Sequence, residues 1–247
     1  MQDTQGLIFP DLIINNGTVY AFFTNRLFKG GPLSFISSDI SMDARLYMPV
    51  QRHTDIVVRA EEVIDGPPAI ADAVITNRPG LFIAIKTADC VPVLIYDPCR
   101  KVIGAVHAGW RGTVQWILSK TINHMGAQYG SRAKDLLVAI GPSIGACCYE
   151  VGPEVAEKIA EGRDKTCVMA KRGGYYADLQ RANTIEALSL GVREDNIWCC
   201  KECTYCLPDR YHSYRYSKQQ ALRQYGIIGL LDSSILDNPK NGLIKCD

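Results

Sequence analysis

The chain is most informative between Leu81 and Thr113, where it reads LFIAIKTADCVPVLIYDPCRKVIGAVHAGWRGT. Apolar runs rich in β-branched residues predict three buried strands in this stretch, over 81–85, 91–96 and 102–106. The second and third runs are joined by DPCR at 97–100, which fits a type I turn with aspartate first and proline second. The pattern therefore predicts an antiparallel hairpin next to another strand.

A cysteine and a histidine lie at the open end of this hairpin. If the hairpin is centred on the turn, residue numbers on opposite strands sum to 197, so Cys90 faces His107 directly. Directly opposed Cβ atoms lie about 4.5–5.5 Å apart, within reach of one shared ion. A thiolate and an imidazole suit zinc or copper better than magnesium or calcium, so the pair predicts a metal site.

A third ligand must come from elsewhere in the chain, and His53 is the best candidate. His124 falls inside a predicted helix, and His212 lies in a stretch rich in tyrosine and arginine. Three protein ligands leave a fourth position open, which is typical of a catalytic metal site.

Two other interpretations of Cys90 and His107 stay open. Both can be core residues of an apolar sheet. Alternatively, His107 can deprotonate Cys90 to give a thiol nucleophile that needs no metal. Spacing does not separate a metal site from such a dyad.

The loop after His107 favours a functional site. It places Gly109, Arg111, Gly112 and a cap residue, Thr113, just before a predicted helix. Backbone N–H groups and the helix dipole at such a loop favour an anion, and a guanidinium suits phosphate or carboxylate. Otherwise, the glycines only make a tight turn and Arg111 belongs to a surface ion pair.

The rest of the chain predicts a mixed α/β fold with several adjacent hairpins in one domain over 1–247, because it has no repeat, low-complexity tract or long linker. Strand-like patterns also occur on both sides of a turn at 15–17, within 12–24, and over 55–59, 136–140 and 197–200. Helical patterns cover 114–128, capped by Thr113, then 154–160 after Pro153, and a segment from Asp178 to Leu190 that Gly191 closes.

Composition argues against nucleic-acid and membrane partners. Lys and Arg total 27 against 26 Asp and Glu, and no basic run or bilayer-length apolar segment is present. Without a signal peptide, a cytoplasmic location is expected, where the ten cysteines would be reduced thiols.

The cysteine spacing at 199–206, CCKECTYC, resembles a metal knuckle or an iron–sulfur run. A full cluster run needs a further cysteine followed by proline, and none is present. We therefore interpret these cysteines as reduced, partly buried thiols, and the pair at 147–148 as buried packing, with Cys148 lining the site.

Segments 87–93 and 106–113 resemble the laccase-domain family, also called multicopper polyphenol oxidase-like, whose characterised members are purine nucleoside phosphorylases. The similarity continues at 23–26, 51–53, 71–76, 141–152, 203–204 and 213–215. The chain differs from the family at Thr54, where glycine is usual, in a short segment between Arg26 and Gln51, and in lacking Gly-Arg after Arg215.

The resemblance implies a layered α/β sandwich related to cysteine-hydrolase-like toxin domains, with zinc held by His53, Cys90 and His107, or copper in the same site. It implies phosphorolysis of adenosine, inosine and methylthioadenosine, with adenosine deamination alongside, by a monomer or homodimer whose partners are nucleoside and phosphate. Alternatives are copper-dependent oxidation of phenols and a Cys–His amidase acting on peptidoglycan precursors. Four histidines cannot supply a multicopper centre.

For a deaminase or phosphorylase, a carboxylate must move a proton. Asp89 adjoins a ligand and Glu150 is a second candidate, although Asp89 can equally be a turn or cap residue. Arg111 is expected to hold phosphate. The remaining expected substrate or phosphate contacts are Arg26, Gly109, Gly112, Thr113, Cys148 and Arg215.

Overall fold

Two facing β-sheets form the centre of the molecule. The computed structural model describes residues 6–14, 18–39, 44–218 and 222–231. The larger sheet has the order β13-β9-β7-β8-β5-β4. Its strands are β4 (Val57–Arg59), β5 (Ala73–Thr76), β7 (Val91–Asp97), β8 (Val102–Ala108), β9 (Leu137–Ile140) and β13 (Ile197–Cys199).

The second sheet has the order β1-β2-β14-β6-β3. Its strands are β1 (Leu7–Ile8), β2 (Val19–Thr24), β3 (Arg45–Tyr47), β6 (Leu81–Thr87) and β14 (Gln224–Leu230). Both sheets contain parallel and antiparallel pairs. A small antiparallel sheet, β10-β12-β11, is formed by Glu150–Val151, Gly174–Ala177 and Val168–Lys171.

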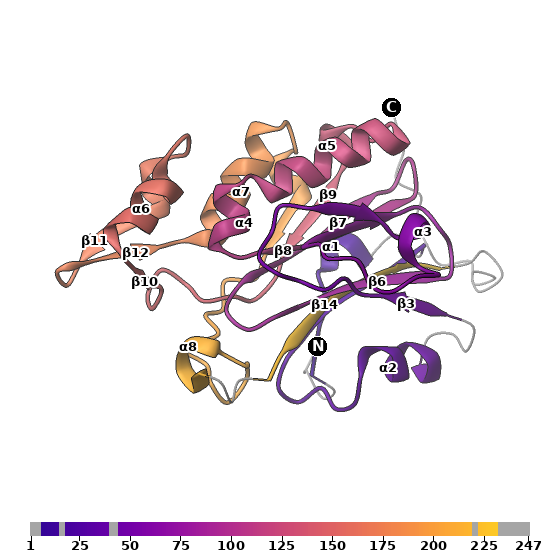
Figure 1. Ribbon diagram of the computed structural model, residues 1–247, viewed down its shortest axis with the longest axis horizontal. Helices are drawn as coiled ribbons and strands as arrows, with labels where there is room; N and C mark the ends of the chain where they lie inside the picture. Colours follow the sequence, from indigo (N-terminus) through magenta and orange to yellow (C-terminus); the bar gives the residue numbers. More distant parts are fainter. Residues whose placement is uncertain (1–5, 15–17, 40–43, 219–221, 232–247) are drawn as a thin grey trace.

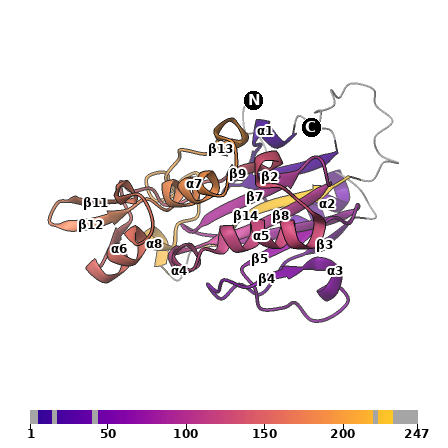
Figure 2. The same cartoon turned by 90° about the horizontal axis from the view of Figure 1, so that it is seen from above.

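Helices cover the outer faces of the two large sheets, so the fold is a layered α/β sandwich (Figure 1). Helices α4 (Trp110–Val114), α5 (Ile117–Tyr129) and α7 (Leu179–Ser189) lie on the six-stranded sheet, and α2 (Pro32–Asp39) lies under the other. Helix α6 (Pro153–Ala160) and the small sheet extend beyond one end (Figure 2). The shorter helices are α1 (Asp11–Ile14), α3 (Ala60–Val63) and α8 (Tyr214–Ser217), with 3-10 turns at Ala133–Asp135, Lys165–Cys167 and Glu194–Asn196.

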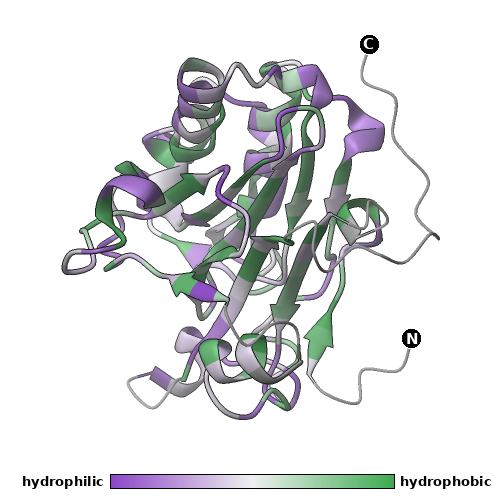
Figure 3. Ribbon diagram, turned by 90° about the vertical axis from the view of Figure 1, so that its right-hand side faces the viewer, coloured by the Kyte–Doolittle hydropathy of each residue, from purple (hydrophilic) through white to green (hydrophobic). Residues whose placement is uncertain are grey.

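The central strands β7 and β8 are mostly apolar, apart from Asp97 and His107, because both of their faces are buried (Figure 3). Side chains alternate, so Val93 and Ile95 of β7 pack toward the helices. Leu94 and Tyr96 of the same strand pack toward the five-stranded sheet. His107 alternates with the residues of β8 that face the helices, so it points toward the space between the two sheets.

The three strands expected between Leu81 and Val106 are present, but the predicted hairpin register was wrong. Opposed residues sum to 199, with Asp97 opposite Val102, and His107 lies opposite Pro92 instead of Cys90. The connection is four residues long because the Asp97 carboxylate accepts hydrogen bonds from the backbone of Cys99 (2.9 Å) and Arg100 (3.0 Å).

Two other predicted elements were wrong. Thr113 does not cap a helix over 114–128: it is buried inside α4, and the chain breaks at Trp116, whose φ is 62°, before α5 begins. The first strand-like run within 12–24 contributes to helix α1, while the second is β2. The turn expected at 15–17 lies outside the described residues.

The Trp116 break is held by a buried ion pair between the helices. Arg163 contacts Glu186 of α7 at 3.1 Å, and both side chains are almost fully buried. The guanidinium stacks 3.6 Å over the Trp116 ring and donates to the Thr113 carbonyl. Glu186 also accepts hydrogen bonds from the backbone and hydroxyl of Ser119. The pair therefore joins α4, α5 and α7.

No helix in the described part of the chain combines the length and apolar character needed to cross a bilayer.

Candidate active site

Three side chains with metal-binding atoms meet at one end of the sandwich. The ligand atoms of His53, Cys90 and His107 all lie within 4.8 Å of one another. The Cys90 sulfur is 3.8 Å from Nε2 of His53, and the two imidazole rings are 5.0 Å apart between centroids. His124 and His212 are not in this group: His124 is exposed on α5, and the backbone N–H of His212 donates a hydrogen bond to Gln224. The structure therefore brings together the three ligands expected from the sequence.

Cys90 and His107 meet in spite of the shifted register because a shift of two residues keeps each side chain on its own face. His107 lies opposite Pro92, so Cys90 is its diagonal neighbour on the same face. Cys90 immediately precedes β7, after Asp89, whose φ of 85° turns the chain into the strand.

Asp72 organises the two histidines, although it was not among the site residues predicted from the sequence. Its carboxylate is fully buried and lies 2.6 Å from Nδ1 of His107. It also accepts hydrogen bonds from the backbone of Arg52, His53 and Thr54, at 3.1, 3.0 and 2.7 Å. A histidine held at Nδ1 by a carboxylate presents Nε2 as a metal ligand, so Asp72 orients His107 and the His53 loop together.

Glycine is required where the loop after His107 passes the ligands. A Cβ at Gly109 would lie 3.0 Å from the Cys90 sulfur and 3.0 Å from Cδ2 of His53. Both neighbours are in the metal-ligand set, so neither can move aside without disturbing the site. Gly109 therefore shapes the site by close approach and serves as the N-cap of α4.

Cys90, His107 and Asp72 shift one another's pKa values through their charges and hydrogen bonds. Burial opposes ionisation of Cys90, but the charge and hydrogen bonds of His107 and His53 outweigh it and lower the Cys90 pKa to about 6. Burial likewise opposes charge on His107, yet Cys90 and Asp72 raise the His107 pKa to about 9. Burial also disfavours ionised Asp72, but hydrogen bonds from His107 and the 52–54 loop lower the Asp72 pKa to about 2. Without metal, the favoured state is a thiolate beside an imidazolium.

The donor set fits a zinc ion. One thiolate and two imidazoles match zinc and copper in ligand type, and bonds of about 2.0–2.3 Å can be formed by atoms this close together. Three protein ligands leave one coordination position free, which is the arrangement of catalytic zinc sites.

The ligands open into a cavity of about 550 Å³ with a cationic and aromatic lining. Among the described residues, its charged side chains other than the ligands are Lys86, Arg111, Arg215, Arg223 and a single acid, Asp89. Trp110, Tyr149 and Tyr214 supply aromatic surface. A cavity with flat aromatic walls and several cations suits a planar ring joined to, or reacting with, an anion.

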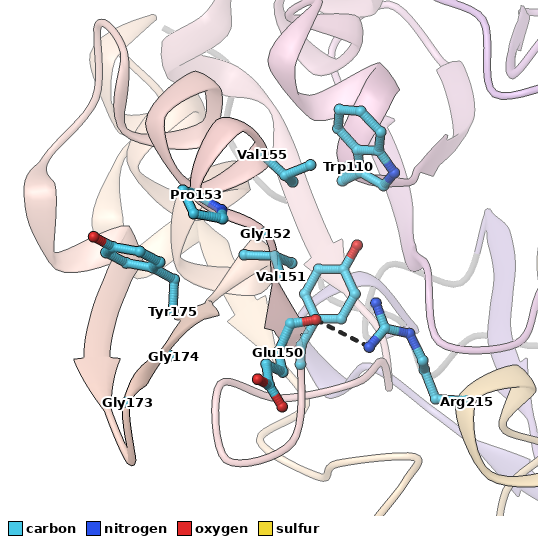
Figure 4. A pocket seen from close by; sticks show the side chains of 11 residues that line it. Trp110, Glu150, Val151, Gly152, Pro153, Val155, Gly173, Gly174, Tyr175 and Arg215 are labelled. Atoms are coloured by element: carbon cyan, nitrogen blue, oxygen red, sulfur yellow. Dashed lines mark hydrogen bonds between the residues drawn. The ribbon is translucent and has the colours of Figure 1, made fainter.

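A second cavity of about 500 Å³ adjoins the first, and Trp110, Tyr149 and Arg215 line both (Figure 4). Arg215 is fixed between them: Nη1 donates to the Glu150 carbonyl at 3.0 Å, and the guanidinium lies 4.9 Å from the Tyr149 ring centroid. Arg111 stacks in the same way on Trp110, at 4.6 Å. Both guanidinium groups are thus placed by aromatic rings.

Asp89 lines the first cavity, and both of its carboxylate oxygens accept hydrogen bonds. Oδ1 accepts from the Thr204 hydroxyl and Oδ2 from the Arg215 backbone, each at 2.7 Å. These bonds favour the turn-and-positioning interpretation of Asp89 over proton transfer. Glu150, the alternative carboxylate, is exposed and lines only the second cavity.

Four of the residues expected to bind substrate lie apart from the first cavity. Gly112 and Thr113 are buried in α4, where the Thr113 hydroxyl accepts from Asn183 at 3.2 Å. Arg26 is exposed and donates to the Pro208 carbonyl at 2.7 Å. Cys148 contacts Cys206 at 3.3 Å between sulfurs. Of the expected contacts, Arg111 and Arg215 reach the cavity directly.

Replacing Asp72 with asparagine is expected to weaken zinc binding by about 10–100-fold, because the neutral amide no longer holds Nδ1 of His107 as a charged acceptor. Competition with a chromogenic chelator measures this change. Asp65→Asn, which alters an exposed carboxylate paired with Arg45, is the matched control. Equal zinc affinity in the two variants would contradict the role of Asp72.

Comparison with known proteins gives consistent matches. A family model described as multi-copper polyphenol oxidoreductase laccase matches residues 34–231. A purine nucleoside phosphorylase of Bacteroides thetaiotaomicron is 40% identical over 148 residues, which cover 58% of this chain and 55% of that protein, so the match spans about half of that relative. A purine nucleoside phosphorylase of Aquifex aeolicus is 35% identical over 174 residues, covering 70% of this chain and 78% of that protein. The crystal structure of YlmD from Geobacillus stearothermophilus shares the fold, with a TM-score of 0.81 at 22% identity, covering 94% of this chain and 98% of that one.

Proposed function

We propose that this chain, which belongs to the multi-copper polyphenol oxidoreductase laccase family, is a zinc-dependent purine nucleoside phosphorylase. The observation that carries the proposal is the convergence of His53, Cys90 and His107 in the lining of a cationic and aromatic cavity. Relatives named purine nucleoside phosphorylase support the same activity. Adenosine, inosine and methylthioadenosine are the proposed substrates.

In phosphorolysis, a phosphate oxygen forms a bond to C1′ of the sugar while the bond from C1′ to the purine nitrogen breaks. The electron pair of that bond leaves with the base, which takes up a proton. A zinc ion held by His53, Cys90 and His107 would supply a Lewis acid with one open coordination position. The products are the free purine and a sugar 1-phosphate, which is ribose 1-phosphate for adenosine and inosine and 5-methylthioribose 1-phosphate for methylthioadenosine.

The chain's own residues bind and orient the two reactants. Arg111 and Arg215, stacked on aromatic rings, are positioned to hold phosphate with paired N–H donors. Trp110 and Tyr149 offer flat surfaces for the purine. Asp72 holds Nδ1 of His107, which keeps Nε2 directed at the site.

Adenosine deamination is part of the same proposal: the oxygen of water forms a bond to C6 of the purine, the bond from C6 to the amino nitrogen breaks, and inosine and ammonia are the products. The Cys90 thiol is free, but Cys99 is disulfide-bonded, so the prediction that all ten cysteines are reduced was wrong at Cys99. A cytoplasmic location, where thiols are kept reduced, is proposed from the free thiol in the site.

Product analysis tests the activity. Zinc-loaded protein incubated with adenosine and phosphate should release adenine and ribose 1-phosphate in equal amounts. Omission of phosphate should abolish both products while leaving any inosine formation. If none of the three nucleosides yields its sugar 1-phosphate, the phosphorylase assignment is overturned.

Arg111→Ala is expected to raise the KM for phosphate by about 10–100-fold, because a hydrogen bond to a charged group is worth about 1.5–3 kcal/mol. Initial rates at varied phosphate and saturating nucleoside measure the change. Arg193→Ala is the control, since Arg193 is exposed and lines neither cavity. An unchanged KM in the Arg111 variant would place the phosphate elsewhere.

A Cys–His hydrolase is the second candidate, favoured by the lowered pKa of Cys90. It needs Cys90 as the nucleophile and no metal, so its activity would survive chelation and be lost on alkylation. The phosphorylase proposal requires that removal of zinc by a chelator abolish the activity.

The reactivity of Cys90 in metal-free protein is expected to rise with pH, reach half of its maximum near pH 6 and stay high above it. Thiolates react with iodoacetamide and thiols do not, so the rate follows ionisation of a group with a pKa of about 6. Burial raises the pKa of Cys199 to about 11, which separates this thiol from Cys90. Peptide mass spectrometry after timed labelling reads each site, and zinc should protect Cys90. Half-maximal labelling above pH 8 would contradict the charge system described for the site.

A further inference from the structure

Four cysteines outside the active site gather at one point. The sulfurs of Cys147, Cys148, Cys203 and Cys206 all lie within 4.8 Å of one another. Cys206 is 3.5 Å from Cys147 and 3.3 Å from Cys148 between sulfurs. We propose that these four thiols bind a second zinc ion, which joins two loops beside the active-site cavity.

The spacing of the sulfurs fits a single tetrahedral ion. With zinc–sulfur bonds of about 2.3 Å, four thiolates around one ion lie about 3.8 Å apart. The two separations from Cys206 are slightly below this value, the others are within 4.8 Å, and both distances from Cys206 are far above the roughly 2.05 Å of a disulfide bond. Four sulfur ligands fill every coordination position, which is the pattern of a structural zinc site and leaves no open position for substrate.

The local backbone is built around the sulfurs. The Gly145 N–H donates to the Cys203 sulfur at 3.2 Å, the kind of bond that stabilises a thiolate. A Cβ at Gly145 would lie 3.3 Å from the Cys147 sulfur and 3.4 Å from Cβ of Cys203, so a larger residue would press on the cluster. The Gly145 carbonyl then accepts from the backbone of Cys148 and Tyr149, which turns both toward the cluster.

Exposure argues against simple packing of these thiols. Cys147 and Cys206 are exposed and Cys148 is half-buried, whereas a cysteine that serves only as an apolar core residue is normally buried. The prediction that the pair at 147–148 is buried packing was therefore wrong. The cluster also differs from the run seen in the sequence: it combines two residues of 199–206 with two from another loop, and Cys199 and Cys200 are not part of it.

Zinc binding to this cluster displaces the thiol protons and leaves a centre with a net charge of −2 if all four thiols ionise. A cation lies next to the loop: the Lys171 ammonium donates to the carbonyl of Ala146, the residue before Cys147, at 2.6 Å. The positive charge of Lys171 partly offsets the negative charge of the thiolates.

The two loops carry residues of the active-site cavity. One runs directly into Tyr149, which lines the cavity. The other contains Thr204, whose hydroxyl holds Asp89 beside the ligand Cys90, and whose N–H donates to the Ser143 carbonyl at 3.0 Å. A zinc ion between the loops would therefore fix the cavity wall and Asp89 without touching substrate.

Metal analysis of protein purified under reducing conditions and loaded with zinc tests the proposal. Two zinc ions per chain are expected for the unmodified protein, and one for a variant carrying Cys147→Ser and Cys206→Ser. Cys199→Ser, which removes a free thiol outside the cluster, is the control and should keep two. One zinc per chain in all three proteins would overturn the proposal, as would iron in place of the second zinc.

Cobalt spectra of the Cys90→Ser variant give a reading that is independent of the proposed enzyme activity. This variant lacks the thiolate of the active site, so the cysteine cluster is the remaining candidate metal site among the described residues, and intense thiolate-to-cobalt absorption with tetrahedral d–d bands is assigned to it. The bands should be present in Cys90→Ser and be lost when Cys206→Ser is added. Their absence, or a disulfide from Cys206 to Cys147 or Cys148 in protein kept reduced, would overturn the site even if the double serine variant fails to fold.

Discussion

Replacing Cys90 with alanine is expected to lower kcat/KM for adenosine phosphorolysis by at least about 10³-fold. The change removes one of three ligands from the proposed zinc, and a metal ion contributes several kcal/mol to stabilising charge in a transition state. It also removes the negative partner of His107, whose pKa then falls from about 9. Steady-state kinetics and zinc content, measured on the same preparation, should fall together.

Cys199→Ala is the matched control for this experiment. Cys199 is a half-buried free thiol that lines neither cavity and is not part of the cysteine cluster. Its kcat/KM should match that of the unmodified protein. A Cys90→Ala enzyme with full zinc content and less than a tenfold loss would show that the thiolate is neither ligand nor nucleophile.

Replacing Glu186 with alanine is expected to destabilise the fold by about 3–5 kcal/mol, because it leaves the Arg163 charge buried without its partner. For a chain of this size, the thermal midpoint should fall by about 6–20 °C. The loss has a second source, since Ser119 loses the acceptor for its hydroxyl and its backbone N–H. Thermal unfolding followed by circular dichroism measures the effect.

Glu154→Ala removes the same kind of side chain from an exposed ion pair with Lys158 on α6. Solvent-exposed pairs contribute little to stability, so this variant should unfold at the same temperature as the unmodified protein. Similar midpoints for the two variants would contradict the role assigned to the Arg163–Glu186 pair.

For the β7–β8 hairpin, the sequence pattern predicted the strands but not their register. Apolar runs predicted β6, β7 and β8 correctly, because strands buried on both faces need apolar residues throughout. The register was wrong by two residues, since Asp97 caps a four-residue connection instead of opening a tight turn. A shift of two leaves every side chain on the same face, so Cys90 and His107 still meet.

The break at Trp116 was missed for a different reason. Neither glycine nor proline marks it, and the apolar spacing of the segment suits one continuous helix. The left-handed conformation of Trp116 is stabilised by Arg163, which arrives from a distant part of the chain and stacks on the indole. Such a tertiary contact leaves no local signal.

Residue types and their local spacing were enough to indicate the strand set, the capping of α7 by Asp178 and a thiol–imidazole pair at a strand end. The contact between Asp72 and Nδ1 of His107 depends on tertiary packing. The same packing places Arg26 and Thr113 away from the cavity. It also joined Cys147 and Cys148 to Cys203 and Cys206. These groups come from segments many residues apart, and their meeting depends on how the sheets and loops pack, a property that no short window of the chain encodes.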